Sequence, residues 1–500
     1  MLPTIATGNV ASAIGGAYEV ANSCRFNRPD SPRLVIANPT EGVREKGTFS
    51  TWFKKASGGT AQYLFSTWNN ATSGYSSGVI YFPSADDRLN VSNYVASGAS
   101  GHSTVITERR FRDPSAWYHV VVAWDTTDGT AADRYKIYVN GTRETVFNGT
   151  PAYPTADQEL FFQIGGTANP QHIGYQSTGS DTHYFDGYLA ETVHIDGSAL
   201  AADSFGEFDE DSPTIWKPKD VSGLTFGDEG FYLDYEDSGD LGDDESGNGN
   251  DFAETNLAAT DQATDTPTNN FATLNSLVTE SGSTFSEGNC KVVTSSSLGG
   301  GNFSTIAASA GKWYAEFKLT AHSAASAVEA TINVSDTSHV AKFNDGDYTT
   351  FLSRYAVGNW GILNYLGRSY VTSSGSQSTT DTQHDGWALN DIIGVALDCD
   401  NHKVYFSKNG GWQDAVDSWG GSSPDSYLTI QSDFGEGSYV FNVGDSSTSS
   451  TCTWECNFGG SSAFTVSSGN ADGNGYGNFE YAVPSGFLAL CTKNLGSDGG

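Results

Sequence analysis

Three acidic side chains at alternate positions could provide the carboxyls that glycoside hydrolysis requires. Residues 207–211 read Glu-Phe-Asp-Glu-Asp, and an extended strand would place Glu207, Asp209 and Asp211 on one face. A retaining glycosidase holds one protonated and one ionised carboxyl about 5–5.5 Å apart. The stretch follows the last strand expected in its domain, so we expect a solvated acidic loop and predict no catalytic residue.

His119 is the second candidate for chemistry. It lies within an expected strand beside Trp117, and no serine or cysteine in a nucleophile-type turn is close to it in the sequence. We therefore expect a packed, hydrogen-bonded structural histidine. The other histidines show neither HxH nor HxxxH spacing, so they indicate no metal site.

Aromatic residues beside Asn, Asp and Gly are the candidates for binding sugars. Aromatic rings stack on the C–H faces of sugars, while amides and carboxylates bind the hydroxyls. The glycan-binding candidates are Trp360, Tyr365, Trp412, Trp419, Trp68 and Asn69. Trp412 follows the turn at residues 409–411, so it should stand at a hairpin tip. Packing in cores or subunit interfaces is the alternative role for each of these side chains.

Short runs of period two, separated by Gly, Asn, Asp and Ser, predict an all-β fold. Residues 116–125 (AWYHVVVAWD) are apolar on both faces, and residues 135–141 (YKIYVNG) end in an Asn-Gly pair typical of hairpins. The pattern recurs at residues 391–398 (DIIGVALD) and 403–410 (KVYFSKNG). Two antiparallel β-sandwich domains with a shared hairpin design would explain the recurrence, and a chance match of hairpins is the alternative.

An acidic segment separates the two sets of strands. Residues 220–290 contain sixteen acids and no Lys or Arg, and residues 236–283 are rich in Gly, Asn and Asp without an apolar period. Such a composition predicts an extended or loosely ordered connector. We expect an N-terminal arm at 1–22, a sandwich at 23–235, the connector at 236–283 and a second sandwich at 284–500.

The composition excludes several classes of partner. The 500 residues include 25 Lys and Arg and 59 Asp and Glu, which gives a formal net charge of −34. This charge argues against nucleic acid and anionic lipid, which need clustered cations. No apolar run is long enough for a membrane span, and the start lacks the basic region of a secretory signal. Six scattered cysteines predict buried or free thiols.

Two series of motifs follow one another along the chain. The first comprises SCRFN (23–27), FRDPSAWYH (111–119), IYVNG (137–141), FDGYLAE (185–191), WKPK (216–219) and DTPTNNFATL (265–274). It resembles the laminin-G/concanavalin-like jelly-roll domain found in phage virion proteins. The second comprises GKWYAEF (311–317), DIIGVALD (391–398) and NFG (457–459), and it resembles a SPRY-type sandwich.

The resemblance implies a non-enzymatic structural protein of a tailed phage. Such a protein would be assembled in the host cytoplasm and exposed on the virion exterior as a tail, fibre or other appendage. It implies other virion proteins as partners, a homo-oligomer, and contact with host-surface polysaccharide. A capsid decoration protein with a purely architectural role is one alternative. A polysaccharide depolymerase is another, but Asp211 stands where sandwich glucanases carry the acid/base Glu.

The resemblance also raises calcium, because laminin-G-type domains often hold it at a loop edge. Residues 470–475 mimic the opening of an EF-hand loop, but its twelfth position is Tyr481, which is not a calcium ligand. Residues 244–251 offer a carboxylate-rich turn that would suit an ordinary loop equally well. No metal ligand is therefore assigned, and no other cofactor is expected.

Overall fold

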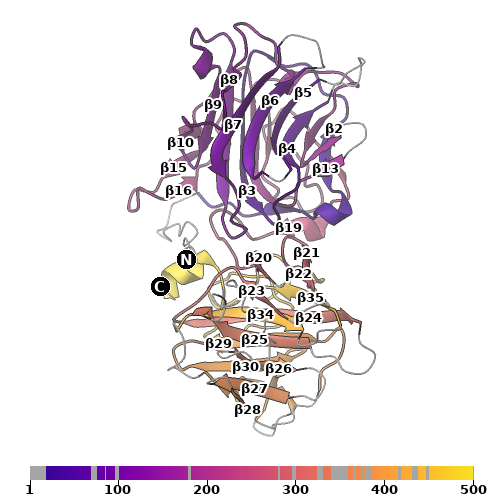
Figure 1. The fold of residues 1–500 in the computed structure, drawn as a ribbon, viewed down its shortest axis with the longest axis vertical. Coiled ribbons are helices and arrows are strands. Elements are labelled where there is room, and N and C mark those ends of the chain that lie inside the picture. The colour runs from indigo at the N-terminus through magenta and orange to yellow at the C-terminus, as the bar shows by residue number, and fades with distance from the viewer. Residues whose placement is uncertain are drawn as a thin grey trace. The chain divides into compact units, whose positions relative to one another are not determined.

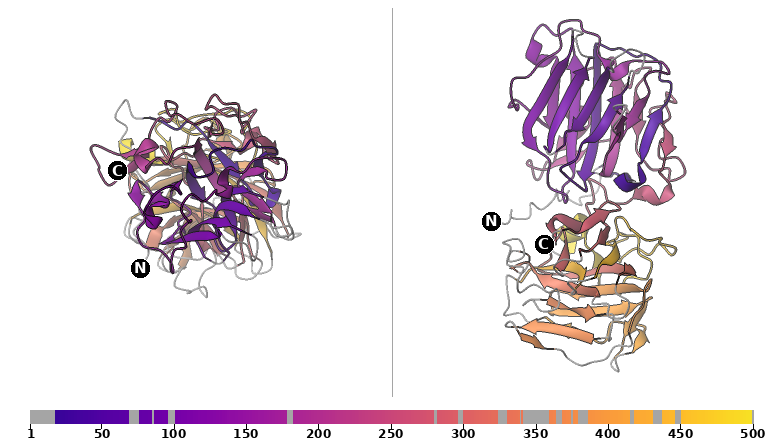
Figure 2. Two further views of the ribbon diagram at one scale, coloured as in Figure 1. Left: turned by 90° about the horizontal axis from the view of Figure 1, so that it is seen from above. Right: turned by 45° about the vertical axis from the view of Figure 1, so that its right-hand side comes forward.

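A computed structural model describes two compact units of the chain, drawn in Figures 1 and 2. The N-terminal unit ends at Thr268, and the C-terminal unit begins at Asn269. The described residues are 18–68, 76–84, 86–95, 101–177, 182–279, 282–295, 300–323, 330–338, 340, 359–363, 368–373, 376–378, 386–414, 418–430, 437–445 and 450–498.

The N-terminal unit is a sandwich of two antiparallel sheets, called sheets A and B (Figure 1). Sheet A contains, in spatial order, β10 (Thr142–Arg143), β9 (Tyr135–Val139), β8 (Tyr118–Asp125), β3 (Lys46–Lys55), β14 (Gly187–Asp196), β1 (Ser23–Phe26) and β19 (Gln262–Ala263), and β17 (Phe231–Leu233) also pairs with β14. Sheet B contains β18 (Ala253–Thr255), β2 (Arg33–Ile36), β11 (Gln171–Ile173), β4 (Gln62–Thr67), β5 (Ser77–Phe82), β6 (Arg88–Tyr94) and β7 (Ser103–Arg110). The all-β prediction is confirmed.

Both faces of sheet A are covered, as the apolar alternation of residues 116–125 predicts. Val120 and Val122 point into the core between the sheets, while Val121 belongs to a second cluster on the opposite face. Strand β3 behaves in the same way, with Phe53 in the first cluster and Trp52 in the second. Period two therefore places alternate side chains of each strand in different layers.

Short elements lie outside the two main sheets of this unit. The 3₁₀ turns are η1 (Arg28–Asp30), η2 (Ala131–Asp133), η3 (Phe161–Gln163), η4 (Ala202–Ser204) and η5 (Ala259–Asp261). Two small hairpins complete the set, β12 (Tyr175–Ser177) with β13 (Thr182–Tyr184), and β15 (Gly206–Phe208) with β16 (Trp216–Pro218). The β15–β16 hairpin supplies Trp216 to the apolar cluster on the outer face of sheet A.

The predicted connector differs from the structure over residues 236–268. This segment belongs to the N-terminal unit, where β18 pairs with β2 and β19 pairs with β1. Asp265 is completely buried, and its carboxylate pairs with Lys54 Nζ at 2.7 Å and accepts a hydrogen bond from Trp117 Nε1 at 3.1 Å. The boundary between the units therefore lies at residues 268–269, because acids in this segment bind to the first sandwich.

The C-terminal unit is also built from two sheets, called sheets C and D (Figure 1). Sheet C contains β20 (Leu274–Thr279), β23 (Gly300–Ser304), β34 (Tyr439–Asp445), β25 (Ala330–Asp336), β26 (Asn359–Leu363), β27 (Arg368–Ser373) and β28 (Ser376–Ser378). Sheet D contains β21 (Thr284–Ser286), β22 (Lys291–Val293), β35 (Cys452–Asn457), β24 (Lys312–His322), β29 (Ile392–Asp398), β30 (Lys403–Lys408), β31 (Gly411–Gln413) and β32 (Trp419–Gly421). In addition, β33 (Leu428–Thr429) pairs with β30 and β36 (Leu488–Ala489) with β24, and helix α2 spans Thr492–Asp498.

The core of the C-terminal unit draws on both of its sheets. Phe317 of β24 lies 6.0 Å from Phe441 of β34, measured between ring centroids. The predicted strands at residues 391–398 and 403–410 form the β29–β30 hairpin, in which Val395 pairs with Phe406. All six cysteines are buried free thiols, as predicted, and Cys24 is the one that lies in the N-terminal unit.

Candidate functional site

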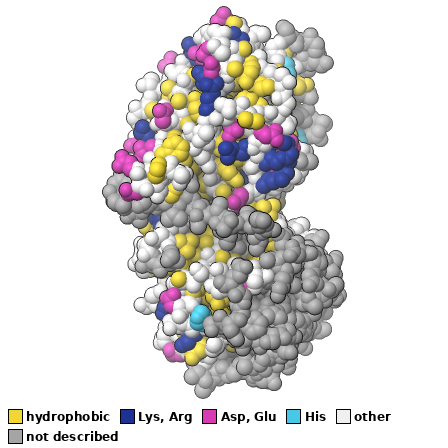
Figure 3. Space-filling model, turned by 60° about the vertical axis from the view of Figure 1, so that its left-hand side comes forward, with side chains coloured by type: hydrophobic (Ala, Val, Ile, Leu, Met, Phe, Trp, Pro, Cys, Tyr) yellow, Lys and Arg dark blue, Asp and Glu magenta, His cyan; other side chains and the backbone are white. Residues whose placement is uncertain are grey.

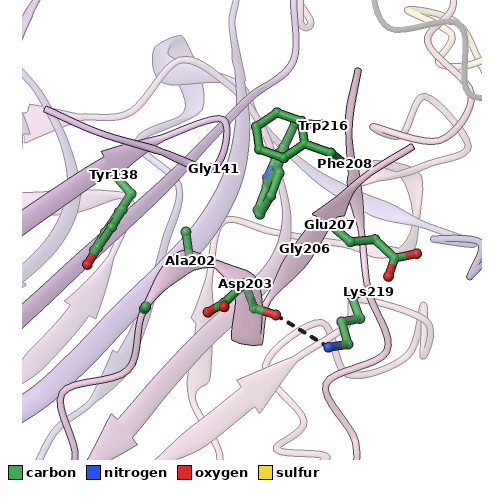
Figure 4. A pocket seen from close by; sticks show the side chains of 10 residues that line it. Tyr138, Gly141, Ala202, Asp203, Gly206, Glu207, Phe208, Trp216 and Lys219 are labelled. Carbon is green, nitrogen blue, oxygen red and sulfur yellow. Dashed lines mark hydrogen bonds between the residues drawn. The ribbon is translucent and has the colours of Figure 1, made fainter. Parts of the chain in front are cut away.

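A pocket of about 440 Å³ opens on the outer side of sheet A in the N-terminal unit. It lies where the β9–β10 turn, η4 and the β15–β16 hairpin meet. Its walls, shown in Figure 4, are formed by Tyr138, Gly141, Ala201, Ala202, Asp203, Gly206, Glu207, Phe208, Trp216 and Lys219. The pocket thus combines three aromatic rings with two carboxylates and an ammonium group.

The aromatic wall is held by two close backbone approaches. A Cβ atom added to Gly141 would lie 2.3 Å from the Trp216 ring, and one added to Gly206 would lie 2.5 Å from it. Gly141 also has φ +77°, which suits the turn after Asn140. Trp216 is only 3% exposed, whereas Phe208 is 43% exposed and meets the indole edge-on at 4.9 Å. Phe208 is therefore the ring most accessible to a ligand.

His119 holds the indole of Trp216 in place through a hydrogen bond. Trp216 Nε1 donates a hydrogen bond to His119 Nδ1 at 3.0 Å, and the imidazole stacks on Trp52 with ring centroids 4.6 Å apart. Because an indole N–H can only donate, His119 Nδ1 must be the acceptor. Burial lowers the pKa of His119 to about 3, so the ring is neutral and its proton lies on Nε2.

The proton position of His119 does not suit a general base for Ser50. Nε2 lies 2.9 Å from Ser50 Oγ and donates its hydrogen to that oxygen. A general base would instead have to accept the hydroxyl proton of the serine. His119 is packed and hydrogen-bonded, as the sequence predicts, and its effect on the pocket is to orient Trp216.

The charged wall of the pocket comes from η4 and the β15–β16 hairpin (Figure 4). Asp203 and Lys219 are exposed, and Lys219 Nζ donates a hydrogen bond to the backbone carbonyl of Asp203 at 3.3 Å. Glu207 extends from β15 on the side of the pocket away from Tyr138 in this view. Among the described residues, the Asp203 carboxylate has no protein partner, so it is available to a ligand.

Lys217 forms ion pairs with two of the three alternating acids. Its Nζ lies 3.4 Å from both Glu207 Oε1 and Asp209 Oδ2. Burial acts to raise the pKa of Asp209, but hydrogen bonds from the Ser212 and Asp211 N–H groups and the Lys217 ion pair outweigh it, so the pKa is lowered. Asp209 therefore stays ionised, whereas a retaining glycosidase needs one carboxyl of its pair protonated.

The described glycan-binding candidates Trp68, Trp412 and Trp419 do not line this pocket. Trp412 is 5% exposed and lies 6.3 Å from Tyr314 in a buried cluster, so its ring is unavailable at a hairpin tip. Trp419 is partly buried under Lys408 Nζ, 5.6 Å from the ring centroid, and Trp68 is partly buried at the end of β4. Asn69, Tyr365 and the side chain of Trp360 lie outside the described residues, so their role stays a prediction.

The two loops that the sequence raised for calcium are closed by hydrogen bonds. Asp472 accepts hydrogen bonds from the N–H groups of Asn474, Tyr476 and Ala489. Asp244 accepts them from the N–H groups of Tyr232, Ser246 and Asn250. Within the part of the chain that the structure describes, no group of three or more His, Cys, Asp or Glu is arranged to hold a metal ion.

Acidic and basic side chains are intermingled on the face of the N-terminal unit seen in Figure 3. The ion pairs of this unit include Arg109 with Glu144 at 2.8 Å and Arg143 with Asp133 at 2.6 Å. No helix among the described residues has the length and apolarity of a membrane span.

Apart from Glu207, which the sequence raised as a possible catalytic carboxyl, the pocket residues were missed because their positions along the chain are unremarkable. Alternation in YKIYVNG turns Tyr138 away from Ile137 and Val139, which indicates an outward-facing ring. Phe208 alternates with Glu207 and Asp209, so it also marks a surface strand with one large apolar side chain. These two signals could have been found, but nothing in the sequence indicates that the two segments meet.

Comparisons with known proteins agree with the sandwich of the N-terminal unit. Residues 34–204 match the family model of the Concanavalin A-like lectin/glucanases superfamily, so the unit has a laminin-G/concanavalin A-like fold. This match spans about a third of the chain, from β2 through β14. The chain matches no curated protein.

Three of the solved structures that the chain matches are a SPRY domain, a pentraxin and a pair of laminin domains. The SPRY domain of human HERC1 is 13% identical with a TM-score of 0.27, and the match covers 37% of this chain and 96% of that one. A SAP-like pentraxin from Limulus polyphemus is 21% identical with a TM-score of 0.26, covering 37% and 80%. Domains LG4-5 of the mouse laminin α1 chain are 10% identical with a TM-score of 0.29, covering 95% and 98%.

Proposed function

We propose that this chain is a non-enzymatic structural protein of a tailed-phage virion that contacts host-surface glycan through the Trp216 pocket. It would lie on the particle exterior, bound to other virion proteins and assembled as a homo-oligomer. The virion assignment rests on the ordered motifs of the sequence. The observation that carries glycan contact is the pocket itself, where an exposed Phe208 ring lies beside free carboxylate oxygen.

The composition of the pocket fits a sugar. A volume of about 440 Å³ is in the range of small-molecule sites, and rings with a few polar groups are the usual lining of such sites. Phe208 and Tyr138 offer apolar faces for the C–H groups of a sugar, while Asp203 and Glu207 accept hydrogen bonds from its hydroxyls. The concanavalin A-like fold of the unit adds support at the level of the fold alone.

The chemistry of the acids supports binding rather than hydrolysis. Glu207 and Asp209 share the Lys217 ammonium, and the lowered pKa of Asp209 removes it as a general acid. His119 holds the wrong tautomer to activate Ser50. A depolymerase would release reducing ends from host polysaccharide, and its Glu207→Gln variant would lose that activity. We expect no release of reducing ends from the wild type or from the variant.

Binding can be tested on a glycan array that includes host-surface polysaccharide. Phe208→Ala should weaken binding by about tenfold, because a stacking face on the sugar is lost. Val146→Ala is the matched control, since Val146 is exposed in the same unit and does not line the pocket. Absence of binding to every glycan, or equal binding by Phe208→Ala and wild type, would overturn the glycan assignment.

The virion assignment is tested separately. Antibody labelling of purified particles viewed in negative stain should mark the exterior, and the position of the label separates a tail appendage from a head decoration. Labelled heads combined with an empty glycan array would favour the purely architectural alternative. Particles that carry no label and no peptide of this chain by mass spectrometry would overturn the assignment.

A further inference from the structure

The charge around the Trp216 pocket is unbalanced in one direction. Residues 203–220 contain six acids and two lysines, a formal charge of −4 (2 − 6). One of the two lysines, Lys217, is already shared between Glu207 and Asp209. The other, Lys219, is exposed at the wall and bonded through Nζ to the Asp203 carbonyl. Asp203 is therefore the carboxylate of the pocket wall that no lysine pairs with among the described residues, and the remaining acids of this segment surround the pocket with negative charge.

The aromatic lining adds to the same preference. The faces of Tyr138, Phe208 and Trp216 carry the negative side of the ring quadrupole, which attracts cations. An ammonium group between such rings and a carboxylate is favoured by both interactions at once. An anionic sugar would meet these carboxylates and the −34 charge of the whole chain, and a neutral sugar would gain neither interaction.

We propose that the pocket selects glycans carrying a free, protonated amine, such as a hexosamine without its N-acetyl group. This inference rests on the proposed function of the pocket and specifies the class of sugar. Asp203 pairs with the ammonium, Phe208 stacks on the ring that bears it, and Lys219 opposes it from the rim. The wall residues thus determine the charge of the ligand rather than its ring stereochemistry.

The test compares oligosaccharides that differ in charge on similar pyranose rings. Titration calorimetry would use chitosan oligomers, which carry free amines, and fully N-acetylated chitin oligomers of the same length. Oligogalacturonate provides the anionic case. At a pH where the amines are protonated and at low salt, we expect chitosan oligomers to bind about tenfold tighter than chitin oligomers, and oligogalacturonate not to bind.

Variants locate the effect in the pocket. Asp203→Asn should weaken chitosan-oligomer binding about fivefold and leave chitin-oligomer binding unchanged, because only the charge is removed. Lys219→Gln should strengthen chitosan-oligomer binding. Glu210→Gln is the control, since it removes one exposed charge of the same hairpin outside the pocket, and we expect it to bind as wild type does.

The outcomes separate this inference from the proposed function. Equal affinity for chitosan and chitin oligomers, or equal losses in Asp203→Asn and Glu210→Gln, would overturn amine selection while glycan binding stands. Tighter binding of oligogalacturonate would overturn it in the same way. An empty glycan array together with no heat from any oligomer would remove the proposed function and this inference with it.

Discussion

At the scale of single residues, His119 shows how a titratable group becomes a packing element. Its neutral ring accepts the Trp216 N–H on one side, donates to Ser50 on the other and stacks on Trp52. Every polar atom of the imidazole is therefore used within the fold. The residue acts on the candidate site only through the indole that it holds.

His119→Phe should destabilise the N-terminal unit by about 1–3 kcal/mol, because the buried Trp216 N–H loses its acceptor. Denaturant unfolding monitored by tryptophan fluorescence measures this loss. His119→Gln keeps an acceptor oxygen and should lose less. A phenylalanine variant as stable as wild type would mean that the hydrogen bond contributes nothing.

Glu191 gives a pH-dependent stability with a defined direction. It is buried at positive φ within a bulge of β14, and its Oε2 accepts hydrogen bonds from Tyr232 OH at 2.9 Å and Tyr18 OH at 3.1 Å. Burial is the largest cause that raises its pKa, from 4.5 to about 8, and nearby Asp234 and Glu236 raise it further. Between pH 4.5 and about 8, the folded chain therefore keeps a proton on Glu191 that the unfolded chain releases.

Because the folded-state pKa is the higher one, the contribution of Glu191 is complete below about pH 4.5 and is lost as the pH rises towards 8. A shift of this size corresponds to roughly 5 kcal/mol between these limits. Glu191→Gln should remove this part of the pH dependence and exceed wild type in stability at pH 9. Unfolding free energies at several pH values, compared between the two proteins, measure it; parallel curves would contradict the assignment.

At the scale of elements, one buried ion pair joins the end of the N-terminal unit to its central strand. Lys54 on β3 and Asp265 after β19 are both almost fully buried, and Ser23 Oγ of β1 donates to the Asp265 carbonyl at 2.7 Å. The segment that follows β17 is therefore anchored across the sheet. Its acids have specific partners, whereas composition alone makes them resemble a solvated linker.

Asp265→Ala should destabilise the N-terminal unit by about 3–5 kcal/mol, because it leaves the Lys54 ammonium buried without its partner. The double variant Lys54→Met with Asp265→Leu should recover most of this loss, since no buried charge remains. Thermal and denaturant unfolding of the three proteins form the measurement. A double variant as unstable as the single one would show that packing, not charge, is responsible.

The hairpins could be predicted from the sequence because their signals are local. Alternation marks β8 and β9, and the Asn-Gly pair that follows β9 marks the turn into β10; the same signals mark β29 and β30 and the turn from β30 into β31. The structure of residues 236–268 depends on distant partners: Lys54, which pairs with Asp265, lies 211 residues before it in the chain. The pocket also depends on contacts between distant segments, since Tyr138 and Phe208 are 70 residues apart in the sequence. Period two indicates that Tyr138 faces outward, but not which segment covers it.

At the scale of the whole molecule, the boundary at residues 268–269 defines which fragment can fold alone. A fragment of residues 18–268 should unfold cooperatively and keep glycan binding, because it contains every strand of sheets A and B and every residue of the pocket. A fragment of residues 18–235 lacks β18, β19 and Asp265, so it should be unfolded or aggregate. Circular dichroism and size-exclusion chromatography distinguish the two outcomes, and a stable shorter fragment would restore the linker interpretation.

The buried thiols can report the opening of each of the two units. Burial raises the pKa of Cys24, Cys399, Cys452, Cys456 and Cys491, so these sulfurs stay protonated and unreactive while their unit is closed. Cys24 is the single thiol of the N-terminal unit, and the other five belong to the C-terminal unit. The rate at which an alkylating reagent marks each peptide therefore records the opening of each sandwich separately, in the unmodified chain and in a single experiment.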